Sequence, residues 1–191
     1  MKMLLSIIMF LSVFAFSSYH QKPMPDGANK RLENGWYCIA DEPKDYIIPT
    51  PIVTVKEFVA LKLDSDYYGT LHIMMGQVCR SKREAWADAT EKWIGKRIGF
   101  VFNDSLITSP QVNMRIESGA FQITAPQGHG IKSLYRELLK EKEDSIDALF
   151  KANNREKDSL FLQRIDAENR DSLINALDYG EVRAWAKGDK N

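Results

Sequence analysis

The acidic residues that could bind a metal ion do not complete a ligand set. Asp64, Asp66 and Gly69 match positions 1, 3 and 6 of a calcium-binding loop, which needs oxygen ligands in a fixed order. Tyr68 stands at position 5 and Met75 at position 12, where oxygen ligands are required. This segment is therefore predicted to be a turn between two strands.

The three histidines also lack the neighbours that chemistry would need. His20, His72 and His129 lie far apart, and none has a second ligand at metal spacing. His129 lies in the sequence QGHG, but no paired serine, cysteine or carboxylate motif accompanies it. Gly95 and Gly99 lack the spacing of a nucleotide-binding glycine loop. We predict no catalytic, cofactor-binding or metal-binding residues, and we expect that the protein is not an enzyme.

Two cysteines, Cys38 and Cys79, are candidates for a disulfide bond. In an oxidising compartment this bond would close a loop of about 40 residues and stabilise the fold by several kcal/mol. The alternative is two separate buried thiols that pack as small apolar side chains. The sequence contains no C-x-x-C motif, so a redox-active pair is not expected.

The overall charge argues against nucleic acid as a partner. Lys+Arg and Asp+Glu are both 26, which gives a net charge of +0. Electrostatic attraction to nucleic acid or anionic lipid needs a basic surface. Hydrophobic and charged contents of 44% and 27% are ordinary for a globular protein with a real core. We expect no nucleic-acid partner.

Residues 1–17 have the pattern of a secretory signal peptide. Lys2 precedes residues 3–16, which are apolar apart from two serines and are fewer than the roughly 20 that a membrane-spanning helix needs. Ser17 supplies a small residue at the expected cleavage site. A buried N-terminal helix and an uncleaved anchor are the alternatives. We expect export, a flexible lead-in at 18–30 and no membrane segment in the mature chain.

The next part of the chain alternates β-favouring runs with turn formers. Gly35–Ala40 is predicted as the first strand, and residues 41–51 as a loop because they contain three prolines. The run IVTVKEFVALKL mixes two periodicities, so we predict a short helix or turn at Val55–Phe58 and a strand at Val59–Leu63. Thr70–Val78 is predicted as a further strand.

An amphipathic helix is predicted after these strands. Ser81 and Glu84 have the spacing of a capping box, in which each side chain binds a backbone amide of the other residue. Gly95 stands where a left-handed glycine would end the helix. The apolar residues at i, i+1, i+4 and i+8 form one face that must be buried: Ala85, Trp86, Ala89 and Trp93.

The stretch Gly95–Thr124 is the centre of the predicted fold. Its first strand, Arg97–Phe102, is closed by the turn formers Asn103, Asp104 and Ser105. A short apolar strand follows and ends at Pro110, which has no N–H for a ladder. The sequence then supplies a second turn and a last strand: Glu117–Gly119 and Phe121–Thr124.

The character of the chain changes at Ile131. Residues 132–177 contain no Pro or Gly, are rich in charge and repeat Asp-Ser-Ile/Leu at spacings of 14 and 13 residues. A spacing of two heptads allows a coiled coil or long helical arm. The alternative is a solvated helix, broken near Asn153-Asn154, with only its first turns packed on the sheet. Trp185 is expected to fold back onto the domain.

Several of these features together resemble a known family. A helix with Thr90 is followed by Gly-Lys, a strand, a two-residue turn, an apolar strand, S-x-P and then I-x-x-G before a strand that ends in Thr. This order resembles the head part of the first periplasmic domain of SecD, the protein-export subunit also found fused as SecDF. The residues that carry the resemblance, which we call the fold signature, are Gly95, Lys96, Asn103, Asp104, Pro110, Gly119 and Thr124.

The resemblance implies a stand-alone α+β head domain that lacks the family's membrane spans. We expect a small, mostly antiparallel sheet packed on one amphipathic helix at 31–131, followed by a charged helical tail at 132–191. It also implies a periplasmic or envelope location in bacteria, a polypeptide or protein partner bound through exposed strand edges, and no cofactor. Partner-binding residues stay unassigned. The alternative function is a structural or oligomerising envelope protein that uses the tail.

Overall fold

The structure, a computed structural model, describes residues 31–65, 72–124, 130–153 and 167–188. The signal peptide expected at 1–17, the lead-in expected at 18–30 and most of the predicted turn after Asp64 lie outside the described residues. The loop that carries His129 lies outside them as well.

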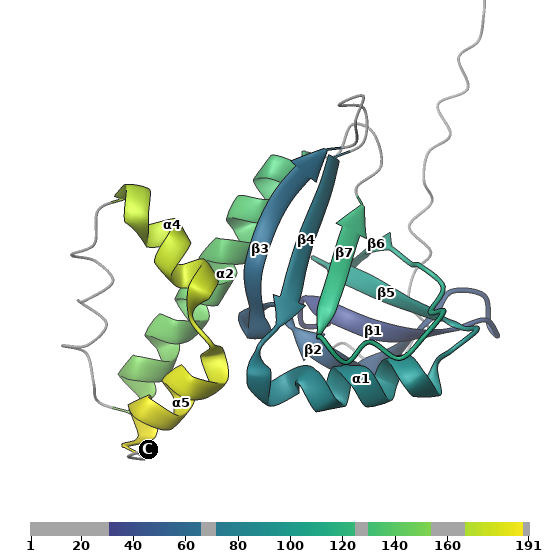
Figure 1. Cartoon of the computed structure of the whole chain (residues 1–191), viewed down its shortest axis with the longest axis horizontal. Helices are drawn as coiled ribbons and strands as arrows, with labels where there is room; N and C mark the ends of the chain where they lie inside the picture. The colour runs from purple at the N-terminus through teal and green to yellow at the C-terminus, as the bar shows by residue number, and fades with distance from the viewer. Residues whose placement is uncertain (1–30, 66–71, 125–129, 154–166, 189–191) are drawn as a thin grey trace, which may run out of the picture.

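Seven strands form two antiparallel sheets instead of the single sheet that was expected (Figure 1). The first sheet has the order β2-β1-β5-β6 and the second the order β3-β4-β7. With the helices, this arrangement confirms the prediction of an α+β fold. The strands are β1 (Gly35–Ala40), β2 (Tyr46–Thr54), β3 (Phe58–Ser65), β4 (His72–Val78), β5 (Arg97–Phe102), β6 (Ser105–Thr108) and β7 (Ala120–Thr124).

The predicted loop at residues 41–51 is wrong in its second half, because β2 begins at Tyr46. β2 contains Pro49 and Pro51, and Pro51 lies opposite Tyr37 of β1. β2 is an edge strand, so a proline N that cannot donate costs no ladder hydrogen bond when it points away from β1. The register shifts along this pair accommodate the irregular backbone.

The short helix and strand predicted from the ambiguous run are confirmed. A 3₁₀ turn, η1 (Val55–Glu57), leads directly into β3. Ala60 has φ +53° at a register shift between Val59 and Lys62, which is a β-bulge. The bulge keeps Leu61 on the buried side of the strand.

The helix α1 (Arg83–Lys92) lies where it was predicted, but its capping box is wrong. A second 3₁₀ turn, η2 (Arg80–Lys82), precedes it, and the N-cap residue Lys82 makes no side-chain cap hydrogen bond. The Ser81 hydroxyl lies 3.3 Å from the Cys79 sulfur. The Glu84 carboxylate instead pairs with Arg115 at 2.9 Å. The buried side chains of the helix are Trp86, Ala87 and Thr90. The buried face is therefore rotated about the helix axis relative to the predicted face.

The turns of the central stretch adopt the predicted conformations. Asn103 and Asp104 have φ +48° and +59°, the pattern of the tight hairpin turn that joins β5 and β6. Gly95 (φ +80°) and Gly119 (φ +74°) take left-handed conformations that favour glycine, after α1 and before β7.

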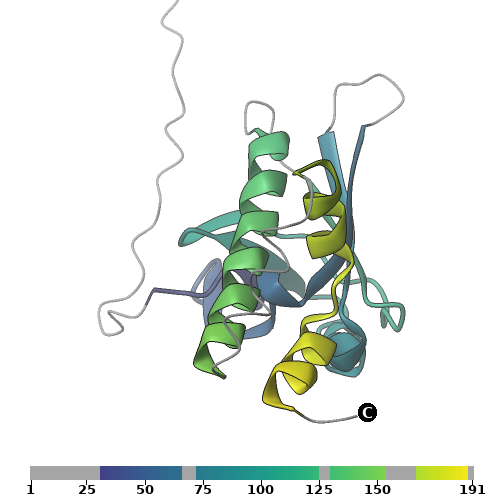
Figure 2. The same cartoon turned by 90° about the vertical axis from the view of Figure 1, so that its left-hand side faces the viewer.

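The C-terminal helices pack against the sheets and against one another. Helix α2 (Ile131–Ala152) has Asn153 as its C-cap residue, and it buries side chains along its whole length, from Ile131 to Phe150, instead of only in its first turns. Helices α4 (Ala167–Ala176) and α5 (Tyr179–Lys187) lie beside α2 (Figure 2). Within the described part of the predicted coiled coil, α2 packs against the core of its own chain. Trp185 contacts Phe150 of α2 edge-to-face at 5.3 Å but remains half exposed.

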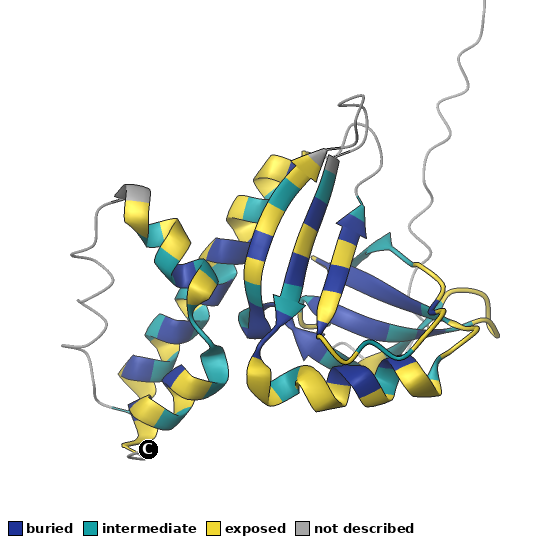
Figure 3. Cartoon of the chain, in the orientation of Figure 1, coloured by how far each residue is buried: buried dark blue, intermediate teal, exposed yellow. Residues whose placement is uncertain are grey.

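One main hydrophobic core joins both sheets and the helices α1, α2, α4 and α5 (Figure 3). Its centre is aromatic: the Trp36 ring lies 5.7 Å from Trp86 and 5.8 Å from Phe121, and Phe121 lies 4.5 Å from Phe58. Such pairs add about 0.5–1.5 kcal/mol each beyond burial. The core therefore extends across the expected boundary at residue 131.

The candidate disulfide is not present. Cys38, in the middle of β1, and Cys79, at the end of β4, are both free. Burial raises the pKa of the Cys38 thiol to about 11 and also raises that of Cys79. Both thiols therefore match the alternative of separate packing residues. None of the helices in the described ranges is long and apolar enough to cross a membrane.

Candidate functional site

An apolar groove of about 390 Å³ lies where the edge strands β6 and β7 of the two sheets approach each other. The Thr108 and Thr124 hydroxyls, one from each edge, are 3.3 Å apart at this junction. None of the described side chains that line the groove is titratable. They are Trp36, Trp86, Ile98, Thr108, Pro110, Gln111, Val112, Asn113, Met114, Ile116, Ala120, Phe121, Gln122 and Thr124.

Two buried tryptophans of this lining carry donors without a partner. Trp36 and Trp86 are 1% and 0% exposed, and the Nε1 atom of each has no hydrogen-bond partner. The hydroxyl of Ser109, next to the lining residues Thr108 and Pro110, is also buried without a partner. A buried unpaired donor costs about 1–3 kcal/mol. These donors are themselves buried, so the surface that a ligand would meet in the groove is mainly apolar and suits apolar side chains.

One wall of the groove is held by polar contacts to α1. Arg115 forms ion pairs with Glu84, Asp88 and Glu91 at 2.7–2.9 Å, all on one face of the helix. The backbone N–H of the next residue, Ile116, donates to the Thr90 hydroxyl at 3.0 Å. These contacts fix the irregular segment between β6 and β7, so the wall has a defined position.

The other wall is the edge strand β7, and its register shows which of its backbone groups do not bond to β4. The Val78 N–H donates to the Gly119 carbonyl at 2.9 Å. Because hydrogen-bonded and non-hydrogen-bonded pairs alternate in an antiparallel ladder, the Gly76–Phe121 and Met74–Ile123 pairs also bond. The N–H and C=O of Gln122 therefore point away from β4. In the described chain, β7 pairs with a strand on one side only.

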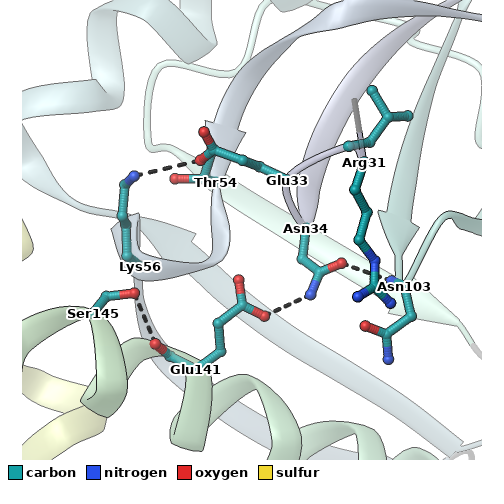
Figure 4. A pocket seen from close by; sticks show the side chains of 9 residues that line it. Arg31, Glu33, Asn34, Thr54, Lys56, Asn103, Glu141 and Ser145 are labelled. Carbon is teal, nitrogen blue, oxygen red and sulfur yellow. Dashed lines mark hydrogen bonds and ion pairs between the residues drawn. The ribbon is translucent and has the colours of Figure 1, made fainter. Parts of the chain in front are cut away.

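A second hollow, of about 230 Å³, is polar, and the side chains that line it contact one another (Figure 4). The Asn34 amide donates to Glu141 at 2.6 Å and accepts from the Asn103 N–H at 2.6 Å. Lys56 pairs with Glu33 at 3.4 Å. Burial raises the pKa of the Glu141 carboxyl, against the lowering effect of the Asn34 hydrogen bond. These contacts tie α2 to the β5–β6 turn, so we interpret this hollow as structural.

The residues of the fold signature are divided between the groove and its supports. Pro110 and Thr124 line the groove. Gly95 and Lys96 support it, because their backbones exchange hydrogen bonds of 2.8 Å with Val112. Of the others, Gly119 directly precedes the groove strand β7, while Asn103 and Asp104 form the hairpin turn near the polar hollow: Asp104 accepts from the Leu32 N–H at 3.0 Å.

Sequence reasoning did not identify the groove residues Trp36, Met114 and Gln122. Trp36 lies in the first predicted strand, and nothing in its local sequence indicates that it meets Trp86. Met114 is 66% exposed, a property that follows only from the path of its loop. His72 lies in β4, and the part of the chain that the structure describes contains no cluster of residues able to hold a metal ion.

Fold and groove together define a small α+β domain with an open apolar site between two sheet edges. Residues 43–129 match the family model described as SecDF, P1 head subdomain, which confirms the resemblance identified in the sequence. The matched region contains all of the groove residues except Trp36. It covers less than half of the chain.

Two solved structures of this family are similar to the chain at low identity. One is described as SecDF in a super-membrane-facing form, with 21% identity over 47% of this chain and a TM-score of 0.39. The other, described as a membrane component SecDF that enhances protein export, has 16% identity over 55% of this chain and a TM-score of 0.45. The aligned regions span 13% and 60% of those chains. No curated protein matches this chain.

Proposed function

We propose that this protein is a non-catalytic accessory domain of the bacterial envelope that binds an extended segment of polypeptide in the groove between β6 and β7. The observation that carries this proposal is the pairing of an available strand edge with an apolar groove. A polypeptide supplies both complements: backbone groups for the β7 edge and apolar side chains for the groove.

The family match supports a role connected with protein export. Residues 43–129 correspond to the P1 head subdomain of SecDF, and one of the similar structures is described as enhancing protein export. Export of this chain through its N-terminal signal, and thus a periplasmic or envelope location, is part of the same proposal.

A binding role also agrees with the chemistry of the groove. Among the described residues, its lining contains no carboxylate, histidine, cysteine or lysine, so these residues supply no group suited to general acid–base or nucleophilic catalysis at neutral pH. An available strand edge recognises backbone with little dependence on sequence. The proposed ligands are therefore extended segments of varied sequence that carry apolar side chains at alternate positions.

The test uses end-blocked peptides of alternating valine and threonine as the probe. In the wild-type protein we expect saturable changes in the indole N–H NMR signals of Trp36 and Trp86, assigned by single Trp→Phe variants. Gln122→Pro removes the outward N–H of β7 without breaking a bond to β4, and should weaken binding at least tenfold. Gln122→Ala keeps that N–H and should bind like the wild type.

Two results would contradict the proposal. One is that the two indole signals stay unchanged at peptide concentrations that saturate other signals. The other is that Gln122→Pro and Gln122→Ala bind the peptide equally well while circular dichroism shows that both are folded.

A further inference from the structure

The opposite edge of the second sheet is covered by the chain's own C-terminal region. The Asn175 side chain of α4 accepts a hydrogen bond from the Leu61 N–H at 2.7 Å and donates one to the Leu61 carbonyl at 2.8 Å. This two-point contact satisfies both backbone groups of a β3 residue, as a neighbouring strand would. Covering an edge in this way prevents pairing with another chain.

The region that carries Asn175, the C-terminal arm (residues 167–188), is held by polar contacts and by apolar side chains that join the main core. The Lys142 ammonium of α2 donates to the carbonyls of Asn175 and Leu177 at 3.3 and 2.5 Å. Asp178 accepts from the Arg80 N–H at 2.8 Å while it caps α5. Ile174, Val182 and Ala186 are the buried apolar side chains of the arm. The arm therefore combines a few specific hydrogen bonds with apolar packing against the main core.

The alternation of the ladder shows which backbone groups of β3 point to its outer edge. Since Met74 pairs with β7, its neighbours Ile73 and Met75 bond to β3, opposite Asp64 and Lys62. The backbone groups of Leu61, Leu63 and Ser65 consequently point to the outer edge. The contact between Leu61 and Asn175 agrees with this assignment.

The exposed charges of β3 make its edge complementary to itself. Lys62 and Asp64 are both exposed and flank Leu63. In an antiparallel pairing of two β3 strands centred on Leu63, Lys62 of each copy lies opposite Asp64 of the other, with Cβ atoms about 4.5–5.5 Å apart. Pairings centred on Lys62 or on Asp64 place like charges opposite each other, which is destabilising. Charge complementarity thus selects one register.

We propose that β3 is a latent dimerisation edge for a second copy of this chain, and that the C-terminal arm masks it in each molecule through Asn175. When the arm is displaced, two β3 strands pair antiparallel about Leu63 and join the β3-β4-β7 sheets of two copies into one continuous sheet. This inference does not depend on the peptide groove, because β3 and β7 are opposite edges of the sheet.

The first test weakens the mask with Asn175→Ala. Loss of two hydrogen bonds should raise the open fraction about tenfold, seen as faster hydrogen exchange of the Leu61 amide. Because both copies must open, the apparent dimerisation constant should tighten about a hundredfold, measured by sedimentation equilibrium. Asn153→Ala, which removes a side chain that donates to the Leu149 carbonyl of its own helix, is the matched control and should behave like the wild type.

The second test examines the register by exchanging charges in the Asn175→Ala background. Adding Lys62→Glu places Glu opposite Asp64 and should weaken the dimer at least tenfold. Adding Lys62→Glu together with Asp64→Lys restores opposite pairs and should restore the dimer. If Asn175→Ala does not fold, Asp178→Ala, which frees the arm at Arg80, takes its place.

Each contrary result would overturn the proposal. Unchanged Leu61 exchange in both arm variants would show that the arm does not mask the edge. Faster exchange without self-association would show that the uncovered edge accepts no second copy. A dimer that is insensitive to Lys62→Glu would exclude the β3 pairing. The Gln122 variants are not used in these tests, so failure here leaves the groove proposal intact.

Discussion

At the scale of single residues, Lys142 is the most unusual group in the described structure. It is 1% exposed and forms no ion pair with a carboxylate of the described residues, and its ammonium also donates to the Phe58 carbonyl at 2.7 Å. Burial lowers the pKa of this lysine from its ordinary value of 10.5 to about 8. The lysine joins the end of α4 to the start of β3, so its charge state affects the packing of the arm.

The lowered pKa predicts a specific pH dependence of stability. Between pH 8 and 10.5 the unfolded chain holds the Lys142 proton and the folded chain releases it, so the free energy of unfolding rises with pH in this window. Relative to Lys142→Met, the wild type should gain about 2 kcal/mol between pH 7 and 9.5. Urea unfolding of both proteins at a series of pH values measures this difference.

The matched control is Lys140→Met, which removes an exposed lysine of the same helix. It should keep the wild-type pH dependence. Burial raises the pKa of Tyr37 to about 12, which lowers stability at high pH, but this effect is common to all three proteins and cancels in the comparison. A pH-independent difference between wild type and Lys142→Met would contradict the prediction.

At the scale of elements, α1 shows how one helix serves both the core and the groove. Trp86 lies at 0% exposure between Trp36 and Phe121, whereas Trp93 is only partly buried and lies under the Lys96 ammonium at 5.0 Å. The sequence placed both tryptophans on one buried face. In the structure their burial differs, because the buried face of α1 consists of Trp86, Ala87 and Thr90.

This difference predicts unequal costs for the two truncations. Trp86→Ala should lower the free energy of unfolding by about 3–5 kcal/mol, since it leaves a cavity in the aromatic centre. Trp93→Ala should cost clearly less, because its ring remains partly in water. Urea unfolding monitored by circular dichroism measures both variants, and equal costs would contradict the burial difference.

At the scale of the whole molecule, the main core does not stop at the expected domain boundary. Leu138 and Ile146 of α2 are fully buried in the same cluster as Phe58, Phe100 and Phe121 of the sheets. A helix that buries side chains along its whole length against a sheet should unfold with it. We therefore expect the sheets and α2 to unfold in one transition. The domain boundary at residue 131 stays a prediction from the sequence.

Leu138→Ala tests whether α2 and the sheets unfold together. It should cost about 2–5 kcal/mol, and unfolding should remain a single transition in which tryptophan fluorescence and circular dichroism coincide. The control Ile94→Ala removes a side chain that is 50% exposed and should change stability by less than about 0.5 kcal/mol. Two separate transitions in the wild type would show that the helices and sheets unfold independently.

The sequence by itself determined the features that depend on neighbours along the chain. Turn residues with positive φ, such as Asn103 and Gly119, and the periodicity of α1 and β7 follow from local sterics and side-chain spacing. The order of these features was sufficient to identify the family resemblance, because spaced glycines and prolines mark fixed backbone positions.

Only the tertiary structure decided the features that depend on distant partners. β2 accommodates its prolines because it is an edge strand. Glu84 forms an ion pair with Arg115 instead of capping its own helix. Trp36 met Trp86 at the groove, and Asn175 reached Leu61, 114 residues away. Local patterns constrain backbone shape, whereas burial and edge pairing are set by which segments meet. The groove and the masked edge are therefore products of the assembled fold.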